Sequence, residues 1–212
     1  MTRAVTRREE NREARRAAIV ATARGEFLEH GYAATSMSTI ATALGGSKGT
    51  LWAYFPSKED LFTAVLDDAT ATFRANLDDA LRPGRDCRTT LLDFSERFLA
   101  KLIDPDSLRL HRLIVGEAGR FPEIGRIFFA RGPQVVLDRL SGYLARCMAA
   151  GDLRHDDPLV AAMNLIQLTQ MQHNLRLWGM AGPPEPGELG RHAERALDVF
   201  MRAYAIAAPH GS

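Results

Sequence analysis

The stretch from residue 35 to residue 62 limits the fold more than any other part of the chain, because it predicts two short helices joined by a glycine turn. Thr35 or Ser36 can cap the first helix by accepting a hydrogen bond from its free N–H groups. Apolar residues then recur at helical spacing, at Met37, Ile40, Ala41 and Leu44. Gly45 follows, where the helix must stop and the backbone must enter the left-handed region.

The second of these helices has an outer face that a protein core does not use. Ser47 can cap the helix, and Leu51 and Phe55 form its inward side. The residues left outside are Lys48, Gly49, Thr50, Trp52, Ala53 and Tyr54. A glycine in a helix costs roughly 1 kcal/mol relative to alanine, which suits a backbone that must approach another molecule. The pair therefore predicts a helix-turn-helix, in which the start of the second helix meets the base edges of DNA.

The alternative is that both helices lie on the surface of an all-α domain with an ordinary solvated face. Trp52 beside Tyr54 argues against it, since both rings gain from burial or from a partner. Pro56 ends the second helix, because the residue before a proline disfavours the helical region. Ser57 can then cap a third helix.

Residues 12–66 resemble the DNA-binding domain of the TetR/AcrR family of bacterial transcriptional regulators. The resemblance runs through Ala17-Ala18-Ile19, Ala23, Phe27, Gly31-Tyr32, Thr35-Ser36, Ile40-Ala41, Leu44-Gly45, Ser47-Lys48-Gly49-Thr50-Leu51, Tyr54-Phe55 and Lys58-Glu59-Asp60-Leu61-Phe62. It implies that the residues near DNA bases are Ser38, Lys48, Gly49, Thr50, Trp52 and Ala53. It also implies that the residues holding phosphates are Thr35, Ser36, Tyr54 and Lys58.

Three residues depart from the family pattern. Gly46 stands where valine is usual in the turn, Trp52 where tyrosine is common, and Ala53 where histidine or another long polar residue is frequent. Burying a valine is worth up to about 1.5–3 kcal/mol, so the turn is expected to be looser than usual. Ala53 offers only a methyl contact. Base readout is therefore expected to depend on Lys48, Thr50 and Trp52.

The predicted organisation is a basic arm at residues 1–11, a DNA-binding domain at 12–72 and a ligand-binding and dimerisation domain at 73–212. Residues 1–16 carry six arginines and three glutamates, so the arm can reach phosphates or a minor groove. The alternative is a frayed, solvated terminus. No run of 18 or more apolar residues predicts a membrane span, so we expect a cytoplasmic protein without a membrane partner.

The rest of the chain predicts further helices and no strands, so the expected fold is all-α. It combines a homeodomain-like three-helix DNA-binding domain with a C-terminal helical domain. Helices are expected at 57–81, 86–103, 105–119, 122–150, 159–178 and 188–207. Gly132-Pro133 lies inside the fourth of these and is expected to kink or divide it.

The last two helices carry more apolar surface than one neighbour can cover, which predicts a homodimer. The interface residues expected are Val160 on the first helix and Leu189, Ala193, Leu197, Phe200, Met201 and Tyr204 on the second. Two helices from each subunit would form a four-helix bundle. The family resemblance implies the same pairing. The alternative is that part of each stripe belongs to the core of one subunit.

Residues 112–124 and the later Gly132-Pro133 resemble the C-terminal domain of AefR-like members of the family, which implies a helical ligand-binding core. Candidate pocket residues combine apolar bulk with an occasional polar group; they are Phe94, Phe98, Leu113, Phe128, Gln167, Gln170, Met171, Asn174 and Trp178. For each of them, plain core or dimer interface is the alternative. His111 and His173 are expected to be exposed or hydrogen-bonded rather than ligands.

The expected function is ligand-controlled DNA binding. A small apolar effector in the core would tilt the helix that begins at Ser57 and lower the affinity for double-stranded operator DNA. The family resemblance favours a repressor. An activator and a ligand-independent architectural DNA binder are the alternatives.

An enzyme is not expected. Helical bundles can house di-iron sites built on Glu-x-x-His motifs, and the sequence has none. It also has no Cys/His metal cluster, phosphate loop or nucleophile motif, so no catalytic residue, metal or cofactor is predicted. Cys87 and Cys147 fit no metal or redox spacing; reduced thiols are expected, and a redox-sensing pair is the alternative.

Overall fold

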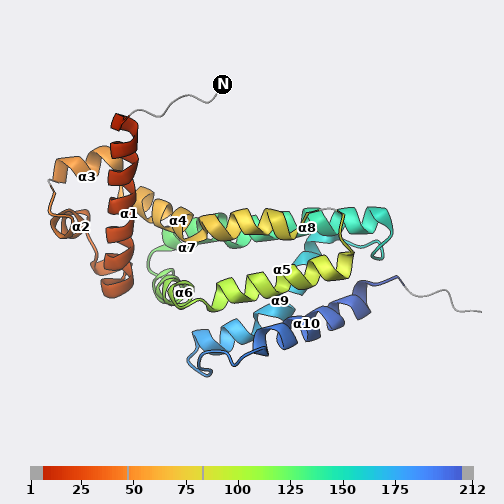
Figure 1. Cartoon of the computed structure of the whole chain (residues 1–212). Helices are drawn as coiled ribbons and strands as arrows, with labels where there is room; N and C mark the ends of the chain where they lie inside the picture. Colours follow the sequence, from red (N-terminus) through yellow and green to blue (C-terminus); the bar gives the residue numbers. More distant parts are fainter. Residues whose placement is uncertain (1–6, 47, 83, 207–212) are drawn as a thin grey trace, which may run out of the picture. The chain divides into compact units, whose positions relative to one another are not determined.

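The computed structural model describes residues 7–46, 48–82 and 84–206, and leaves out the side chain of Lys48. Over these residues the fold is all-α, as predicted, with ten helices and one isolated bridge between Leu153 and Ala205. The helices are α1 (Arg7–Ala34), α2 (Met37–Ala43), α3 (Lys48–Tyr54), α4 (Lys58–Ala80), α5 (Cys87–Ile103), α6 (Pro105–Glu117), α7 (Pro122–Arg131), α8 (Pro133–Ala150), α9 (Pro158–Leu177) and α10 (Glu188–Tyr204) (Figure 1). The expected cap at Ser47 lies outside the described residues.

The chain forms two compact units. The N-terminal unit contains the described residues up to Thr70 together with Arg112–Arg131, and the C-terminal unit contains Ala71–His111 and the described residues from Gly132 onward. The first cut falls close to the expected boundary after residue 72, but the sequence gives no sign that residues 112–131 return to the N-terminal unit. As a consequence, α4 and α6 each begin in one unit and end in the other.

α1 begins at Arg7, so the last residues of the expected basic arm are helical, while residues 1–6 lie outside the described residues. Gly31 interrupts the end of α1 with φ 83° and ψ 164°, a conformation that favours glycine. On either side of this break, the rings of Phe27 and Tyr32 stack with centroids 5.6 Å apart. Both rings meet Phe62 of α4, at 5.4 and 5.2 Å, so aromatic contacts join α1 to α4 in the core of the N-terminal unit.

α2 and α3 form the predicted helix-turn-helix. Ser36 caps α2 through a reciprocal pair of bonds: its hydroxyl accepts the Thr39 N–H at 3.0 Å, and the Thr39 hydroxyl accepts the Ser36 N–H at 3.3 Å. Gly45 has a φ of +62°, and the N–H groups of Gly45 and Gly46 donate back to carbonyls of the last turn of α2 at 3.0 and 3.3 Å. The cap at Ser36 and the left-handed glycine at 45 are confirmed.

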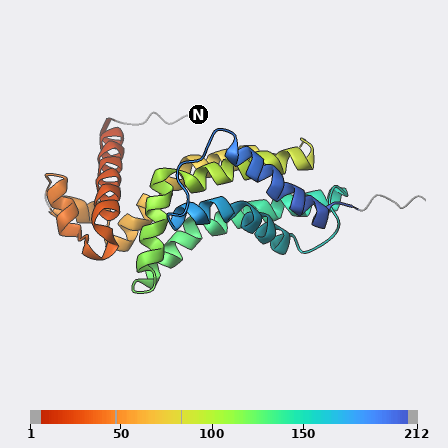
Figure 2. The ribbon, with the colours of Figure 1, turned by 90° about the horizontal axis from the view of Figure 1, so that it is seen from below.

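Helices α5, α8, α9 and α10, together with the end of α4, form the core of the C-terminal unit (Figures 1 and 2). α10 packs against α5 and α9, and α9 also packs against α5 and α8. The expected interruption at Gly132 is a full division, because α7 ends at Arg131 and Pro133 takes the first position of α8. Fully buried side chains that fill this core include Leu91, Phe94, Leu140, Leu144, Leu165 and Leu197.

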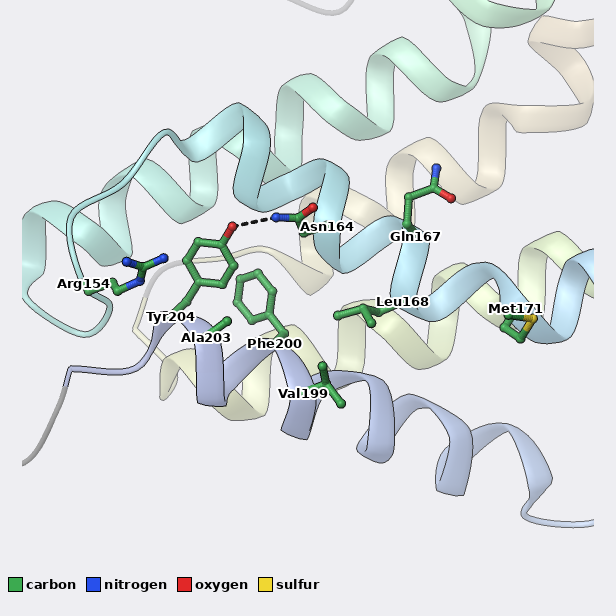
Figure 3. Close-up of a pocket in the computed structure, with 9 residues that line it drawn as sticks. All are labelled: Arg154, Asn164, Gln167, Leu168, Met171, Val199, Phe200, Ala203 and Tyr204. Carbon is green, nitrogen blue, oxygen red and sulfur yellow. Dashed lines mark hydrogen bonds between the residues drawn. The ribbon is translucent and has the colours of Figure 1, made fainter.

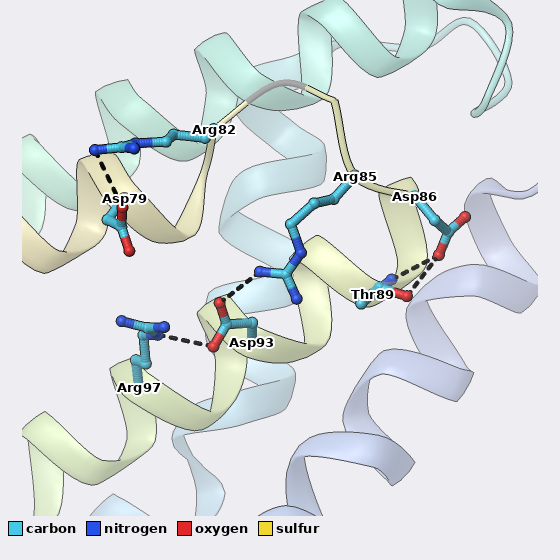
Figure 4. A network of polar contacts seen from close by, with 7 residues as sticks. All are labelled: Asp79, Arg82, Arg85, Asp86, Thr89, Asp93 and Arg97. Atoms are coloured by element: carbon cyan, nitrogen blue, oxygen red, sulfur yellow. Dashed lines mark hydrogen bonds and ion pairs between the residues drawn. The ribbon is translucent and has the colours of Figure 1, made fainter.

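Charged side chains hold the connection between α4 and α5 (Figure 4). Asp86 caps α5, its carboxylate accepting the Thr89 N–H at 2.8 Å. Asp93 pairs with Arg97 at 2.7 Å and with Arg85 at 3.1 Å, and the bond from Arg97 holds the pKa of Asp93 below its ordinary value. Exposed ion pairs of this kind contribute little stability, so their main effect is to orient the start of α5.

Adjacent glycines in the α2–α3 turn should differ in their response to substitution by alanine. Gly45→Ala should lower the free energy of unfolding by about 1–2 kcal/mol, because its left-handed backbone excludes a Cβ. Gly46→Ala has no such penalty; its Cβ would meet only the mobile end of Arg15, 2.8 Å away. Urea unfolding of both variants measures the difference, and equal losses would contradict the assigned turn.

Candidate nucleic-acid interface and regulatory core

The outer face of α3 is open to solvent. Leu51 and Phe55 are buried, with 2% and 3% exposure, which confirms the predicted inward side. On the other side Gly49 and Ala53 are exposed, and Trp52 keeps 48% of its surface in solvent. Thr50 and Tyr54 are half-buried at the edges of this face, and the side chain of Lys48 lies outside the described residues. The described side chains of this face are uncharged and include an exposed indole.

Gly49 has no structural reason to be a glycine. Its φ is not positive, and a Cβ built on it would find no described atom within 4 Å outside its own helix backbone. Gly31 contrasts with it, because there a positive φ and a close neighbour both require glycine. Gly25 of α1 is equally free of close neighbours, so the space around Gly49 allows another molecule to approach the backbone of α3 without requiring one.

Arg15 of α1 occupies part of the space that the usual valine of the turn would fill. Its guanidinium nitrogen lies 2.8 Å from the position that a Cβ on Gly46 would take. The void that remains beside Gly46, between α1, α2 and α3, measures only about 10 Å³. The turn is therefore filled in part by a guanidinium, and a cation stands next to the start of α3. Arg16, one residue further, lies over the ring of Phe55 at 5.1 Å.

Two of the expected phosphate contacts are used inside the protein. Thr35 is buried, and its hydroxyl donates to the carbonyls of Gly31 at 2.8 Å and Glu26 at 3.1 Å, so the prediction that Thr35 holds a phosphate is wrong. Lys58 donates from Nζ to the carbonyl of Tyr32 and lies 3.9 Å from the centre of its ring. Burial also lowers the pKa of Lys58. A phosphate would have to draw Lys58 out of this contact.

Ser36 and Ser38 remain available at the start of α2. Both are exposed, although the Ser36 hydroxyl already takes part in the capping box. Helix starts present N–H groups and hydroxyls that suit phosphate oxygens. The described part of the interface thus consists of the start of α2, the outer face of α3 and Arg15.

Two of the residues expected to line an effector pocket, Gln167 and Met171, lie along one described cavity, and the others are placed as follows. Phe94 and Phe98 stack on each other in the core, with ring centroids 5.6 Å apart. Leu113 and Phe128 belong to the N-terminal unit. Trp178 is 66% exposed at the end of α9. The remaining four are Gln167 and Met171, which are exposed, and Gln170 and Asn174, which are half-buried.

Gln167 and Met171 line a groove of about 600 Å³ between α9 and α10, called here the α9–α10 groove (Figure 3). Asn164 donates to the hydroxyl of Tyr204 across it at 2.7 Å. The guanidinium of Arg154 lies 5.1 Å from the centre of the Tyr204 ring. The other residues along the groove are Leu168, Val199, Phe200 and Ala203. The groove is mixed in character, apolar along its sides and polar at the Tyr204 end.

The predicted dimer residues divide into two groups. Ala193, Leu197, Phe200 and Tyr204 have at most 4% exposure, so their assignment to the interface is wrong: they pack against α5 and α9 of the same subunit. Leu189 and Met201 are half-buried, and Val160 is 41% exposed. The large apolar side chains that do face outward on these two helices are Leu159, Val160, Met163, Met171 and Val199.

Sequence spacing could have identified this outward face. Val160, Met163, Gln167 and Met171 follow one another at intervals of three or four along α9, and Val199 and Ala203 do the same on α10. The predicted interface rests instead on the longest stripe of α10, which is the inward one. Length of a stripe indicates burial, and does not distinguish the core of a subunit from an interface.

His111 and His173 form a hydrogen-bonded pair in the C-terminal unit. Nδ1 of His111 lies 2.9 Å from Nε2 of His173, and Nδ1 of His173 lies 3.0 Å from the carbonyl of Leu102. A carbonyl only accepts, so His173 donates to Leu102 and its Nε2 accepts from His111. Burial and the neighbouring His173 lower the pKa of His111 to about 4, and burial lowers the pKa of His173.

Cys87 and Cys147 are both buried and meet in the core of the C-terminal unit. A hydrogen bond joins their side chains; it lowers the pKa of Cys147 and raises that of Cys87. Over the described residues no group of three or more His, Cys, Asp or Glu side chains could hold a metal ion. In the same part of the chain, no helix has the length and apolar character that crossing a bilayer requires.

Comparison with known proteins gives two family matches. Residues 19–65 match the bacterial regulatory proteins of the tetR family, and residues 89–206 match the AefR-like transcriptional repressor C-terminal domain. Over 49 residues the chain is 47% identical to the HTH-type transcriptional repressor ComR of Escherichia coli (strain K12). That segment spans 23% of this chain and 23% of ComR, so it reaches only the DNA-binding part.

Solved structures match over most of the chain. A structure from Mesorhizobium loti MAFF303099 that is assigned to the TetR family is 28% identical, with a TM-score of 0.80, and the match covers 92% of this chain and 99% of that one. The flavonoid-responsive regulator FrrA is 32% identical, with a TM-score of 0.78, over 92% of this chain and 100% of its own.

The histidine pair should make stability fall with acidification. In an unfolded chain His111 titrates near pH 6.5, whereas its folded pKa is about 4. Between these values the unfolded chain binds a proton that the folded chain does not, so the free energy of unfolding decreases as pH falls. Urea unfolding at pH about 7.5 and about 5.5 measures this loss, above the range in which carboxylates titrate. His111→Asn should show a smaller loss than the wild type; an equal loss would exclude His111 as its source.

Proposed function

The chain belongs to the TetR family of bacterial transcriptional regulators, and from this premise we propose that it binds operator DNA as a homodimer and responds to a small apolar effector. Regulators of this family are not enzymes. The observation that carries the DNA-binding proposal is the outer face of α3, where the bare backbone at Gly49 stands on the same helix as the exposed Trp52. A DNA backbone or base edge can lie against this face.

The proposed DNA contacts follow the geometry of the described interface. The outer face of α3 enters the major groove, where Trp52, Thr50 and Ala53 reach base edges and the methyl groups of thymine. Tyr54 at the edge of this face and Ser36 at the start of α2 meet phosphates. Lys48 and Ser38 complete the set that the family resemblance implies. Arg15 is added to it, because its guanidinium lies beside the turn that precedes α3.

The proposed dimer pairs the outward faces of α9 and α10. Five large apolar side chains on these helices keep 41% to 55% of their surface in solvent, which is unfavourable for a subunit that stays alone. Two helices from each subunit would bury them in a four-helix bundle related by a two-fold axis. A dimer also explains how a short helix becomes specific, since two recognition helices then read half-sites one helical turn of DNA apart.

The effector proposal draws support from relatives. FrrA, which is similar over nearly the whole chain, is a flavonoid-responsive regulator, and a flavonoid is a small aromatic molecule. The C-terminal match to an AefR-like repressor domain favours repression over activation. α4 and α6 each have residues in both units. A ligand that binds one position of these helices more tightly than another changes operator affinity by at most that difference in binding free energy. Such a regulator acts beside the chromosome, in the cytoplasm.

Gly49→Ala should separate folding from DNA binding. Alanine at this helical position should raise the free energy of unfolding by about 0.4–1 kcal/mol. The same methyl group should weaken binding to DNA, because it stands where the DNA backbone or base edge approaches. Gly25→Ala is the matched control, a helical glycine of α1 that is also exposed and without close neighbours. It should stabilise the protein equally and leave DNA binding unchanged.

The measurement is a fluorescence titration of each variant with a duplex that the wild-type protein selects from a random-sequence library. A Gly49→Ala variant that binds as tightly as the wild type would contradict the assignment of α3 to the major groove. Failure of the wild-type protein to select any duplex would overturn the function itself.

Charge on the outward face should separate the subunits without unfolding them. Met163→Glu combined with Val199→Glu should give a folded monomer, because both side chains are about half exposed in one subunit. Leu197→Glu should instead unfold the protein, since Leu197 is fully buried in the core. Sedimentation velocity with circular dichroism distinguishes these outcomes. A double variant that remains a dimer would refute the interface.

A further inference from the structure

Glu117, the last residue of α6, forms hydrogen bonds to the end of α1, at residues 31–33, which are called here the joint between α1 and α2. One carboxylate oxygen accepts the N–H of Tyr32 at 2.9 Å, and the other accepts the N–H of Ala33 at 2.7 Å. The partners are 85 and 84 residues apart in the sequence, so this is a tertiary contact. Hydrogen bonds from backbone N–H groups to a carboxylate are among the stronger ones in proteins. All three residues belong to the N-terminal unit.

Gly31 makes this approach possible. A Cβ on Gly31 would lie 2.6 Å from the nearer Glu117 oxygen, closer than nonbonded atoms come. Its φ of 83° also turns the next two N–H groups out of the helix, toward α6. The break in α1 at Gly31 and the carboxylate of Glu117 therefore depend on each other.

Tyr32 is held from its remaining sides as well. Lys58 of α4 donates to its carbonyl, and the Tyr32 ring contacts Phe62 at 5.2 Å and Phe121 at 5.6 Å. Phe121 follows Glu117 by four residues, so the segment after α6 meets both the backbone and the ring of Tyr32. The joint is fixed by a carboxylate, an ammonium and aromatic rings from three parts of the chain.

The helix-turn-helix comes directly after this joint in the chain. The Thr35 hydroxyl donates to the Gly31 carbonyl at 2.8 Å, and α2 begins two residues later. α2 in turn packs against α3. Any displacement of Tyr32 and Ala33 therefore moves the start of α2, and with it the outer face of α3.

We propose that Glu117 is a positioning residue for DNA recognition: its two hydrogen bonds set the orientation in which α2 and α3 meet the operator. This rests on the proposed operator binding. α6 begins in the C-terminal unit, where His111 is bonded to His173 of α9. Through Glu117, α6 is therefore a second connection to the helix-turn-helix, in addition to α4. A shift of α6 would reach α2 without passing through the length of α4.

The test compares Glu117→Gln with Glu123→Gln, which removes the same charge from the neighbouring helix α7. Glutamine has one acceptor oxygen, so one of the two N–H groups loses its partner. Binding to the selected duplex should weaken about tenfold, the factor that corresponds to one charge-assisted hydrogen bond. Binding to a shuffled duplex should stay as in the wild type, and the melting temperature should fall by no more than a few degrees, because one hydrogen bond is lost. Glu123→Gln should match the wild type in all three.

A second measurement reads the contact directly. In ¹⁵N–¹H spectra of the intact protein, the amide protons of Tyr32 and Ala33 should exchange slowly with solvent, and faster in Glu117→Gln. Glu117→Asp keeps the charge and both acceptors on a shorter side chain, so it should recover part of the operator affinity and of the protection.

The outcomes are distinct. Faster exchange at both amides with unchanged operator affinity would overturn the positioning role, and so would unchanged exchange. Equal weakening on selected and shuffled duplexes, or loss of helical structure at the temperature of the binding assay, would reduce Glu117 to a structural contact and also overturn it. If the wild-type protein selects no duplex, the proposed function fails first and this inference falls with it.

Discussion

The rest of the N-terminal unit depends on the aromatic contacts among Phe27, Tyr32 and Phe62. α2 and α3 have seven residues each, far too short to hold a helical shape in water by themselves. They persist because Ile40, Leu51 and other apolar side chains are buried in the core that these rings anchor between α1 and α4. A helix stabilised only by its inner face leaves its outer face free of structural duties. That is the physical condition under which Gly49 and Trp52 can serve another molecule.

In the C-terminal unit, too, helices are held by their inner faces and leave an outer face exposed. α10 uses one apolar stripe for the core of its own subunit, through Leu197 and Phe200, and a second, weaker one for the outside, through Val199. On α9 the two faces are nearly equal in hydrophobicity, as Leu165 lies inside and Met163 outside. Large apolar side chains on both faces of a helix indicate that both faces are covered. One subunit does not cover the outward faces of α9 and α10, which is why we propose that a second copy does.

The sequence predicted the elements well because their signals are local. A cap at Ser36, a left-handed glycine at 45 and the break at Gly132 each depend on a few adjacent residues, and all three are present. The errors concern what lies opposite a side chain. Thr35 matches the family motif, yet its hydroxyl is satisfied by the carbonyls of Gly31 and Glu26. The pocket residues stay a prediction for a related reason, since bulk with a polar group describes core, interface and cavity alike.

By itself, the sequence determined the all-α class, the helix-turn-helix and the family, because spacing, caps and turn glycines act within a few residues of one another. Only the tertiary structure decided which apolar stripe of α10 faces inward, that residues 112–131 join the N-terminal unit, and that Glu117 binds the backbone at Tyr32 and Ala33. These depend on contacts between segments up to 85 residues apart. A carboxylate that accepts from main-chain N–H groups leaves no complementary residue type in the sequence, so no pattern could have announced it.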